Sequence, residues 1–247
     1  GTRHMKVSVV IPSFNEATYI GGLLEDLSEQ DFDSFEVIVS DAESKDMTSD
    51  VVKSYSDKLD IKLVSSPPKG PANGRNLGAK KAKGEWLLFL DADVEIDDPK
   101  FIDTLVKKAG ENNWQTASAK INPSHGTLKE RFGMRANYRY IKLLAKTKHP
   151  VAPGWCILTK REIFEKHLGF NEKIQFGEDY DYVTRVGDHG HGFVEDTYYY
   201  VDFRRAREEG WRLSVKAVLN EVYRHTHDYN LENNPYKYEF GKHKERK

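Results

Sequence analysis

Residues 84–96 read GEWLLFLDADVEI, and this stretch decides the fold. Five large apolar residues, from Trp86 to Leu90, follow one another without alternation, which predicts a strand buried on both faces. Two carboxylates come directly after it, at the strand end where open α/β sheets bind their ligands. Residues two apart in an extended chain point to the same side, so Asp91 and Asp93 can face one ion. We therefore expect Mn²⁺ or Mg²⁺ at these oxygens, with turn or capping acids as the alternative interpretation.

The composition is that of a soluble protein without special affinity for nucleic acid. Residues 1–4, before Met5, resemble the remnant of an expression tag and are left out of the interpretation. The formal net charge of -1 predicts no general binding to nucleic acid. Cys156 is the single cysteine, which excludes an internal disulfide and fits a reducing compartment. Since no leader is visible and no run approaches the ~18 apolar residues of a membrane span, we expect a cytoplasmic protein that at most rests on the inner membrane face.

Strands and helices alternate four times before residue 97. We expect strands at 6–11, 35–39, 61–64 and 84–90. Helices with apolar residues at helical spacing follow the first two strands, and a third helix opens at 73–78 and reaches Lys83. This alternation predicts a parallel sheet that is covered by helices and joined by right-handed crossovers. All loops that follow the strands then lie on one edge of the sheet.

Those loops carry polar residues that are typical of a nucleotide site: Glu16, Asp41, Arg75, Asp91 and Asp93. Taken singly, Asp41 could be a helix N-cap and Arg75 a solvated helix charge, so the joint occurrence carries the prediction. No G-x-G-x-x-G follows the first strand and no G-x-x-x-x-G-K-[ST] occurs, which argues against a dinucleotide fold and excludes a P-loop. Without such glycines, a metal ion must carry much of the charge of a diphosphate.

After residue 97 the pattern becomes α+β. We expect strands at 116–121, 156–159 and 198–203, and helices from Pro99 and at 126–146, 161–168, 178–185 and 208–225. The last helix has an apolar side made of Trp211, Val215, Val218, Leu219 and Val222. The chain after Tyr229 is expected to be frayed. The prediction is one domain at 5–229, with a nucleotide-binding half at 5–97, an acceptor-binding half at 98–229 and a tail at 230–247.

Six segments, in this order and at these intervals, resemble the inverting GT-A glycosyltransferases of family 2. They are VSVVIPSFNE at 7–16, DAESKDMT at 41–48, GRNLG at 74–78, DAD at 91–93, GFNE at 169–172, and ED at 178–179 with Arg185. The resemblance implies an α/β fold of the GT-A kind, with a Rossmann-like, mostly parallel sheet flanked by helices and an α+β acceptor side. The chain departs from the family at Ala42-Glu43, where Asp-Gly is usual, and at a single Gly169, where a pair is common. The Q-x-x-R-W motif and the spans of processive synthases are missing, so we do not expect a polymerising synthase.

The resemblance also implies roles for the matching residues. Asp179 would be the catalytic base, and Asp93 would bind the metal directly with help from Asp91. A histidine far down the chain, His225 or His227, would complete the metal shell, although an exposed surface histidine is the other interpretation of each. Arg204 belongs to a basic pair with Arg205 that would meet the diphosphate or neutralise nearby acids. The base and ribose pocket would be lined by Pro12, Glu16, Asp41 and Arg75.

The resulting hypothesis is a metal-dependent transferase that moves a hexosyl or N-acetylhexosaminyl group from a UDP-linked donor to a hydroxyl of a saccharide, a lipid-linked or another acceptor. Two alternatives stay open: a non-catalytic module that binds nucleotide sugars, and a sugar nucleotidyltransferase. The helices at 126–146 and around Trp211 could lie on an anionic membrane. A solvated basic face with an apolar core side is the other interpretation of these helices.

Overall fold

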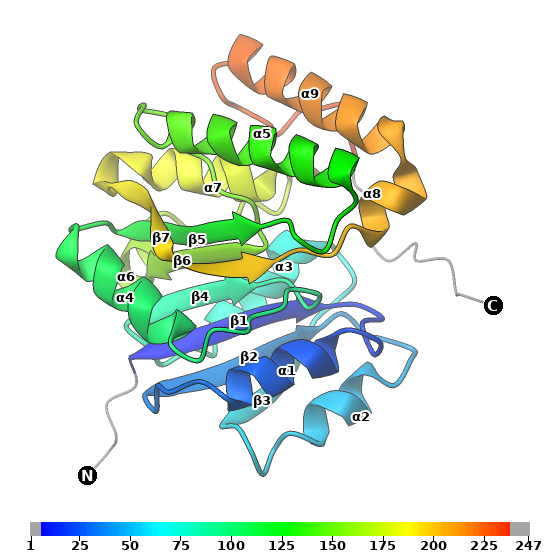
Figure 1. Cartoon of the computed structure of the whole chain (residues 1–247), viewed down its shortest axis with the longest axis vertical. Coiled ribbons are helices and arrows are strands. Elements are labelled where there is room, and N and C mark those ends of the chain that lie inside the picture. The colour runs from blue at the N-terminus through cyan, green and yellow to red at the C-terminus, as the bar shows by residue number, and fades with distance from the viewer. Residues whose placement is uncertain (1–5, 238–247) are drawn as a thin grey trace.

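Four parallel strands form the first half of the sheet, in the spatial order β3, β2, β1, β4 (Figure 1). The computed structural model describes residues 6–237. The strands are β1 (Val7–Ser13), β2 (Phe35–Asp41), β3 (Ile61–Ser65) and β4 (Trp86–Leu90). Every residue of β1 and of β4 is buried, as unbroken apolar and β-branched runs require of strands covered on both faces. The predicted parallel sheet is confirmed.

Three helices cover this half: α1 (Ile20–Ser28), α2 (Thr48–Lys53) and α3 (Pro71–Ala79). The helix α3 packs closest to the sheet, because glycines face the strands. A Cβ atom on Gly78 would lie 2.5 Å from Val10 Cγ1, and one on Gly74 would lie 3.2 Å from Pro12 Cβ. This close approach brings Arg75, the residue after Gly74, to the edge of the sheet where the strands end.

Some boundaries in the first half differ from those predicted. The strand β1 continues through Pro12 to Ser13, and β2 continues to Asp41. Pro12 is tolerated because it lies beyond the last pair that β1 makes with β4, Val10 with Phe89, where fewer ladder hydrogen bonds are required. The helix α3 begins at Pro71, a favoured first helical residue, and ends before the predicted Lys83.

The second half continues the same sheet with β6, β5 and β7, in that spatial order. The strand β6 is antiparallel to β4 and to β5, whereas β7 is parallel to β5. The mixed second half is therefore as predicted, and it shares one sheet with the first. Its elements are α4 (Phe101–Glu111), β5 (Thr116–Asn122), α5 (Leu128–Leu144), β6 (Cys156–Lys160), α6 (Arg161–Lys166), α7 (Glu178–Val186), a 3₁₀ turn (Gly187–His189), β7 (His191–Tyr200), α8 (Arg204–Glu209) and α9 (Trp211–Thr226).

The start of β7 was missed by the sequence reading, which placed it at residue 198 instead of His191. Glu195 and Asp196 stand in the middle of this strand and are exposed. The register of β7 with β5 shifts between the pairs Ala119–Val194 and Lys120–Tyr198, so Glu195 and Asp196 lie in a bulge. The bulge interrupts the apolar pattern that would mark the strand.

The predicted helix at 208–225 is two helices, α8 and α9, which are separated at Gly210, where φ is 58°. Of the two interpretations of its apolar side, packing on the core is wrong, because Trp211, Val215, Val218, Leu219 and Val222 are all exposed. The buried side of α9 carries Asn220 and Arg224 instead. Arg224 is accommodated there by a salt bridge to Glu221 (Nε to Oε1, 2.8 Å), which satisfies a charge that burial alone would disfavour.

The chain after Tyr229 belongs to the fold as far as the structure describes it. Leu231 is buried, and Asn234 Nδ2 donates to the carbonyl of Phe176 (3.3 Å). The prediction of a frayed tail is therefore wrong for 230–237, while 238–247 and the predicted tag at 1–4 lie outside the described residues. No helix within 6–237 has both the length and the apolar composition needed to cross a membrane.

Candidate active site

Arg75 stands at the centre of the site and joins two acidic segments. Its Nη2 donates to Asp91 Oδ1 (2.9 Å) and its Nη1 donates to Glu178 Oε1 (2.7 Å). The guanidinium is buried and lies over the ring of Phe170, with 5.2 Å from Cζ to the ring centroid. Gly154 leaves room for it, since a Cβ there would be 2.3 Å from Nη2. The acid after β4 and the acids that open α7 are thus held at one place.

Asp179 lies in the first turn of α7, after Gly177, whose left-handed φ of 90° turns the chain into the helix. Its Oδ2 accepts a hydrogen bond from the backbone N–H of Gly154 (2.7 Å), and its Oδ1 accepts one from the N–H of Tyr180 (2.9 Å). Burial, followed by the charge of Glu178, raises the pKa of Asp179 to about 7, against the opposing effect of Arg75. The side chain is still partly exposed, so a ligand can reach it.

Asp93 and Glu16 share Arg204. The Nη2 of Arg204 lies 2.8 Å from Glu16 Oε2 and 3.2 Å from Asp93 Oδ2, and its guanidinium stacks on the ring of Tyr19 at 3.9 Å from the centroid. Burial, with the charge of Asp91 next, raises the pKa of Asp93 to about 7, and Arg204 acts against this. Of the two roles predicted for Arg204, the neutralisation of nearby acids is the one visible in these contacts.

The pair Asp91 and Asp93 suits a hard divalent cation. Both offer carboxylate oxygens at the end of β4, and the negative charge of Asp91 is one cause of the raised pKa of Asp93, so a cation would relieve their repulsion. Burial likewise raises the pKa of Asp91, although Arg75 opposes the shift. Within 6–237, no three His, Cys, Asp or Glu side chains are grouped to hold a metal, so these two residues would need ligand oxygens to complete a shell.

The two candidate histidines are not brought to this pair. His227 is exposed at the end of α9, where its ring stacks on Tyr223 (3.8 Å between centroids) and its Nδ1 lies 3.0 Å from the Tyr223 carbonyl oxygen. His225 Nε2 lies 3.2 Å from Tyr140 Oη. Each therefore fits the alternative interpretation of a surface histidine.

Asp41 organises the loop after β2. Its carboxylate accepts hydrogen bonds from Ser13 Oγ (3.0 Å), from Ser44 Oγ (2.6 Å) and from the N–H of Ser44 (3.0 Å). Pro12 of β1 is also buried and pairs with Ser40, the residue before Asp41. Glu43 has a left-handed φ of 57°, which glycine adopts without steric cost. Glutamate at this position, where the family usually has glycine, therefore strains the turn. This loop and the end of β1 are thus joined by hydrogen bonds at the carboxyl ends of the strands.

Sequence reasoning missed some of the residues that build the site. Gly154 lies in a predicted loop with no motif to mark it. Glu172 was quoted only as part of a motif; its two carboxylate oxygens accept from Asn73 Nδ2 and from Asn76 Nδ2, both at 2.9 Å, which fixes α3 against the loop before α7. The pairing of Arg75 with Glu178 joins residues that are 103 apart in the chain, and no local pattern reports it.

The fold and the site define a class: an α/β protein with a carboxylate pair and an arginine at the carboxyl ends of parallel strands, where such sheets bind nucleotides. Residues 8–168 match the model of "Glycosyl transferase family 2", and the chain belongs to this family. Its architecture is that of the GT-A fold, as predicted.

A similar sequence is the poly(ribitol-phosphate) beta-N-acetylglucosaminyltransferase TarS of Staphylococcus aureus, 41% identical over 97 residues. The match covers 38% of this chain and 17% of that protein, so the matched segment spans less than a fifth of the relative. The structure of S. aureus TarS 1-349 in complex with UDP has a TM-score of 0.63 and 25% identity, covering 80% of this chain and 60% of that one. A mannosyltransferase of Pyrobaculum calidifontis, solved with GDP-Man and Mn²⁺, shares the fold with a TM-score of 0.75 and 22% identity, covering 91% of this chain and 65% of that one.

Proposed function

We propose that this chain transfers a hexosyl or N-acetylhexosaminyl group from a UDP-linked donor to an acceptor hydroxyl, with inversion at the anomeric carbon. The observation that carries the proposal is the Arg75 bridge, which holds Asp91 of the metal pair and the Glu178-Asp179 pair at one site. UDP is favoured because a TarS structure that is 25% identical was solved with UDP.

The donor side is assigned to Asp91, Asp93 and the two arginines. A divalent cation held by Asp91 and Asp93 would offset the negative charge of the diphosphate leaving group. Arg75 fixes the rotamer of Asp91 through the 2.9 Å hydrogen bond and leaves its second oxygen available. Arg204 lies next to Asp93 and can replace this carboxylate partner by an oxygen of the diphosphate. Carboxylates and phosphates both accept hydrogen bonds from a guanidinium. Pro12, Glu16 and Asp41 are proposed to line the pocket for the base and the ribose.

The acceptor side is assigned to Asp179. Its carboxylate would take the proton of the attacking hydroxyl while that oxygen displaces the nucleotide from the opposite face of the sugar. The hydrogen bond from Gly154 fixes the orientation of the carboxylate, and a base with a pKa of about 7 is suited to accept a proton near neutral pH. One displacement assisted by one base inverts the anomeric centre, whereas retention through a double displacement needs a carboxylate nucleophile beside the anomeric carbon.

The test compares Asp179→Asn with Asp188→Asn, an exposed aspartate just after the same helix. The release of UDP from UDP-N-acetylglucosamine and UDP-glucose is measured with Mn²⁺ over a panel of saccharide and lipid-linked acceptors. Loss of the base should lower kcat by roughly 10²–10⁴-fold while donor binding is kept, and the control should stay within twofold. EDTA should abolish turnover and added Mn²⁺ should restore it.

Other outcomes contradict the proposal. Turnover of Asp179→Asn within a few-fold of the unaltered protein excludes this base. Turnover that is insensitive to EDTA excludes the metal. Release of pyrophosphate from UTP and N-acetylglucosamine 1-phosphate, with no UDP released from the UDP-sugars, indicates a nucleotidyltransferase. A thermal shift with UDP-N-acetylglucosamine but no turnover on any acceptor indicates a binding module.

A further inference from the structure

The outward side of α9 is apolar over its whole length. Trp211, Val215, Val218, Leu219 and Val222 recur at helical spacing and are exposed within 6–237, Trp211 at 73% of its surface. A helix of a globular protein normally turns such a stripe towards the core, and contiguous exposed apolar patches commonly mark binding surfaces. The stripe therefore needs a partner outside the described chain.

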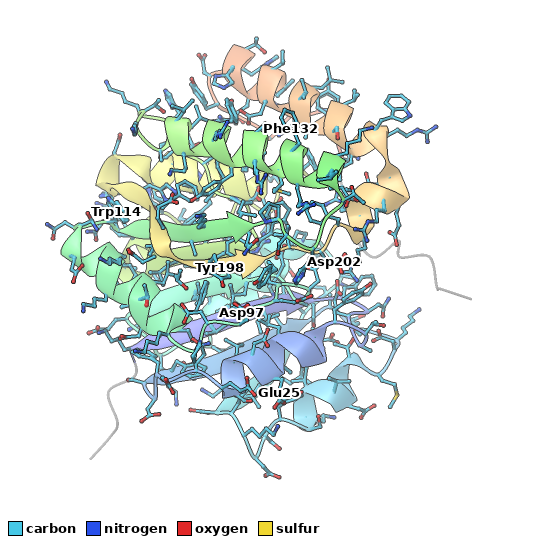
Figure 2. The ribbon with its side chains drawn as sticks, in the orientation of Figure 1. Glu25, Asp97, Trp114, Phe132, Tyr198 and Asp202 are labelled. Carbon is cyan, nitrogen blue, oxygen red and sulfur yellow. The ribbon has the colours of Figure 1, made fainter. Side chains whose placement is uncertain are left out.

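The helix α5 adds a second exposed stripe of a different kind. Leu128, Phe132 and Leu143 are exposed on it, Phe132 at 76% (Figure 2). Arg135 and Arg139 are exposed between them. Neither arginine makes a hydrogen bond or an ion pair with any residue in the described part of the chain, so their charges face solvent. One side of α5 thus carries both apolar and basic side chains.

The two helices form one layer at the end of the molecule remote from α2 (Figure 1). They are joined by Tyr140 Oη of α5, which donates to Glu221 Oε2 of α9 (2.7 Å). Arg207 of α8 also binds Glu130 at the start of α5 (Nε to Oε1, 2.9 Å). We call the exposed residues of this layer the α5/α9 face: Leu128, Phe132, Arg135, Arg139, Leu143, Trp211, Arg212, Val215, Val218, Leu219 and Val222.

The charge of this layer is strongly positive, although the whole chain has a net charge of -1. The spans of α5 and α9 contain eight Lys and Arg residues and only two acids. Of the eight cations, Arg224 is buried against Glu221 and Lys142 is paired with Glu195. Both acids are already paired: Glu130 with Arg207 and Glu221 with Arg224. The partner must therefore accept apolar side chains and offer negative charge.

We propose that the α5/α9 face rests on an anionic lipid bilayer, with both helices parallel to the membrane plane. A helix that lies in the interface inserts large apolar residues, tryptophan among them, while lysine and arginine beside them contact anionic headgroups. A second copy of the same face is disfavoured, because two basic surfaces would be pressed together. The proposal does not depend on the proposed function.

The proposed orientation places the bilayer close to the candidate site. The buried side of α9 packs on α7, where Arg224 Nη1 donates to Thr184 Oγ1 (3.3 Å) and its guanidinium lies over Tyr180. The helix α7 carries Asp179 in its first turn. A bilayer on the α5/α9 face would therefore lie one helix layer away from the helix of the proposed base.

The test is co-sedimentation with vesicles of phosphatidylcholine alone and of phosphatidylcholine mixed with phosphatidylglycerol. We expect binding to the mixed vesicles only, and weakening as salt screens the arginines. Trp211→Ser combined with Val218→Ser should weaken binding about tenfold, and so should Arg135→Gln combined with Arg139→Gln. The matched control is Leu168→Ser, since Leu168 is 88% exposed but lies after α6, outside the face. All these residues are exposed, so the melting temperature should be unchanged.

A spectroscopic measurement localises the contact. Trp211 is the most exposed tryptophan of the described residues, so its fluorescence should shift to shorter wavelength on mixed vesicles, and Trp211→Phe should remove the shift but keep binding. Absence of binding to mixed vesicles overturns the proposal. So does equal weakening by Leu168→Ser, or a dimer in light scattering that Trp211→Ser with Val218→Ser dissociates, because the face would then bind a second copy.

Discussion

Replacing Arg75 with methionine should destabilise the fold by about 3–4 kcal/mol. The guanidinium is 3% exposed and compensates two carboxylates, Glu178 at 2.7 Å and Asp91 at 2.9 Å. Removing one partner of a buried ion pair costs about 3–5 kcal/mol, because the other charge is left without compensation. Glu178 is 9% exposed and would bear nearly all of this cost, whereas Asp91 is 30% exposed and would be relieved in part by water. We therefore place the expected loss at the lower end of that range.

The measurement is urea unfolding followed by circular dichroism, supported by the melting temperature. A loss of this size should lower the melting temperature by roughly 10 °C in a domain of this length. The difference between the two proteins should shrink at acid pH, because protonation of the carboxylates removes the uncompensated charge. Methionine keeps much of the side-chain volume, so the comparison reports charge more than packing.

The control is Arg161→Met, in which an arginine that is 40% exposed loses a Glu165 partner 3.8 Å away. Its effect should stay below about 0.5 kcal/mol, as for most exposed pairs. If Arg75→Met and Arg161→Met differ by less than about 1 kcal/mol at neutral pH, the reasoning on the buried bridge is refuted. A loss that persists unchanged at acid pH would assign the effect to packing instead.

Two further predictions concern the base and the α3 contact. Because burial raises the pKa of Asp179 to about 7 and the base must be unprotonated, kcat/KM should rise between about pH 6 and 8; a flat profile over that interval contradicts the assignment. Gly78→Ala should destabilise by about 1–3 kcal/mol, since its Cβ would meet Val10 Cγ1 at 2.5 Å. Gly22→Ala, with nothing within 4 Å of the new Cβ, should be neutral or stabilise α1 by about 0.5–1 kcal/mol; equal effects in urea unfolding would refute the packing argument.

Much of the first half of the fold was predictable because β1, β2 and β4 are almost wholly buried and α1 buries an apolar stripe. In these elements the sequence pattern follows directly from burial. The same holds for the residues at strand ends: Asp41, Asp91 and Asp93 lie where parallel topology places them. The partnerships among the site residues were not predictable. Arg75 pairs with Glu178, and Arg204 pairs with Glu16 and Asp93. These contacts join segments that are far apart in the chain, so no local sequence pattern predicts them.

The helix α9 shows why periodicity alone misleads. An apolar stripe at helical spacing indicates that one side of a helix is buried, but it does not indicate what covers that side. Packing on the core was one of two interpretations of the stripe, the other being contact with an anionic membrane, and the structure turns Asn220 and Arg224 inward instead. Arg224 can be buried because it forms a salt bridge with Glu221, and Glu221 also accepts a hydrogen bond from Tyr140. The exposed stripe with Trp211 is therefore expected to be a binding surface. The excess of arginine and lysine around it favours an anionic surface as its partner.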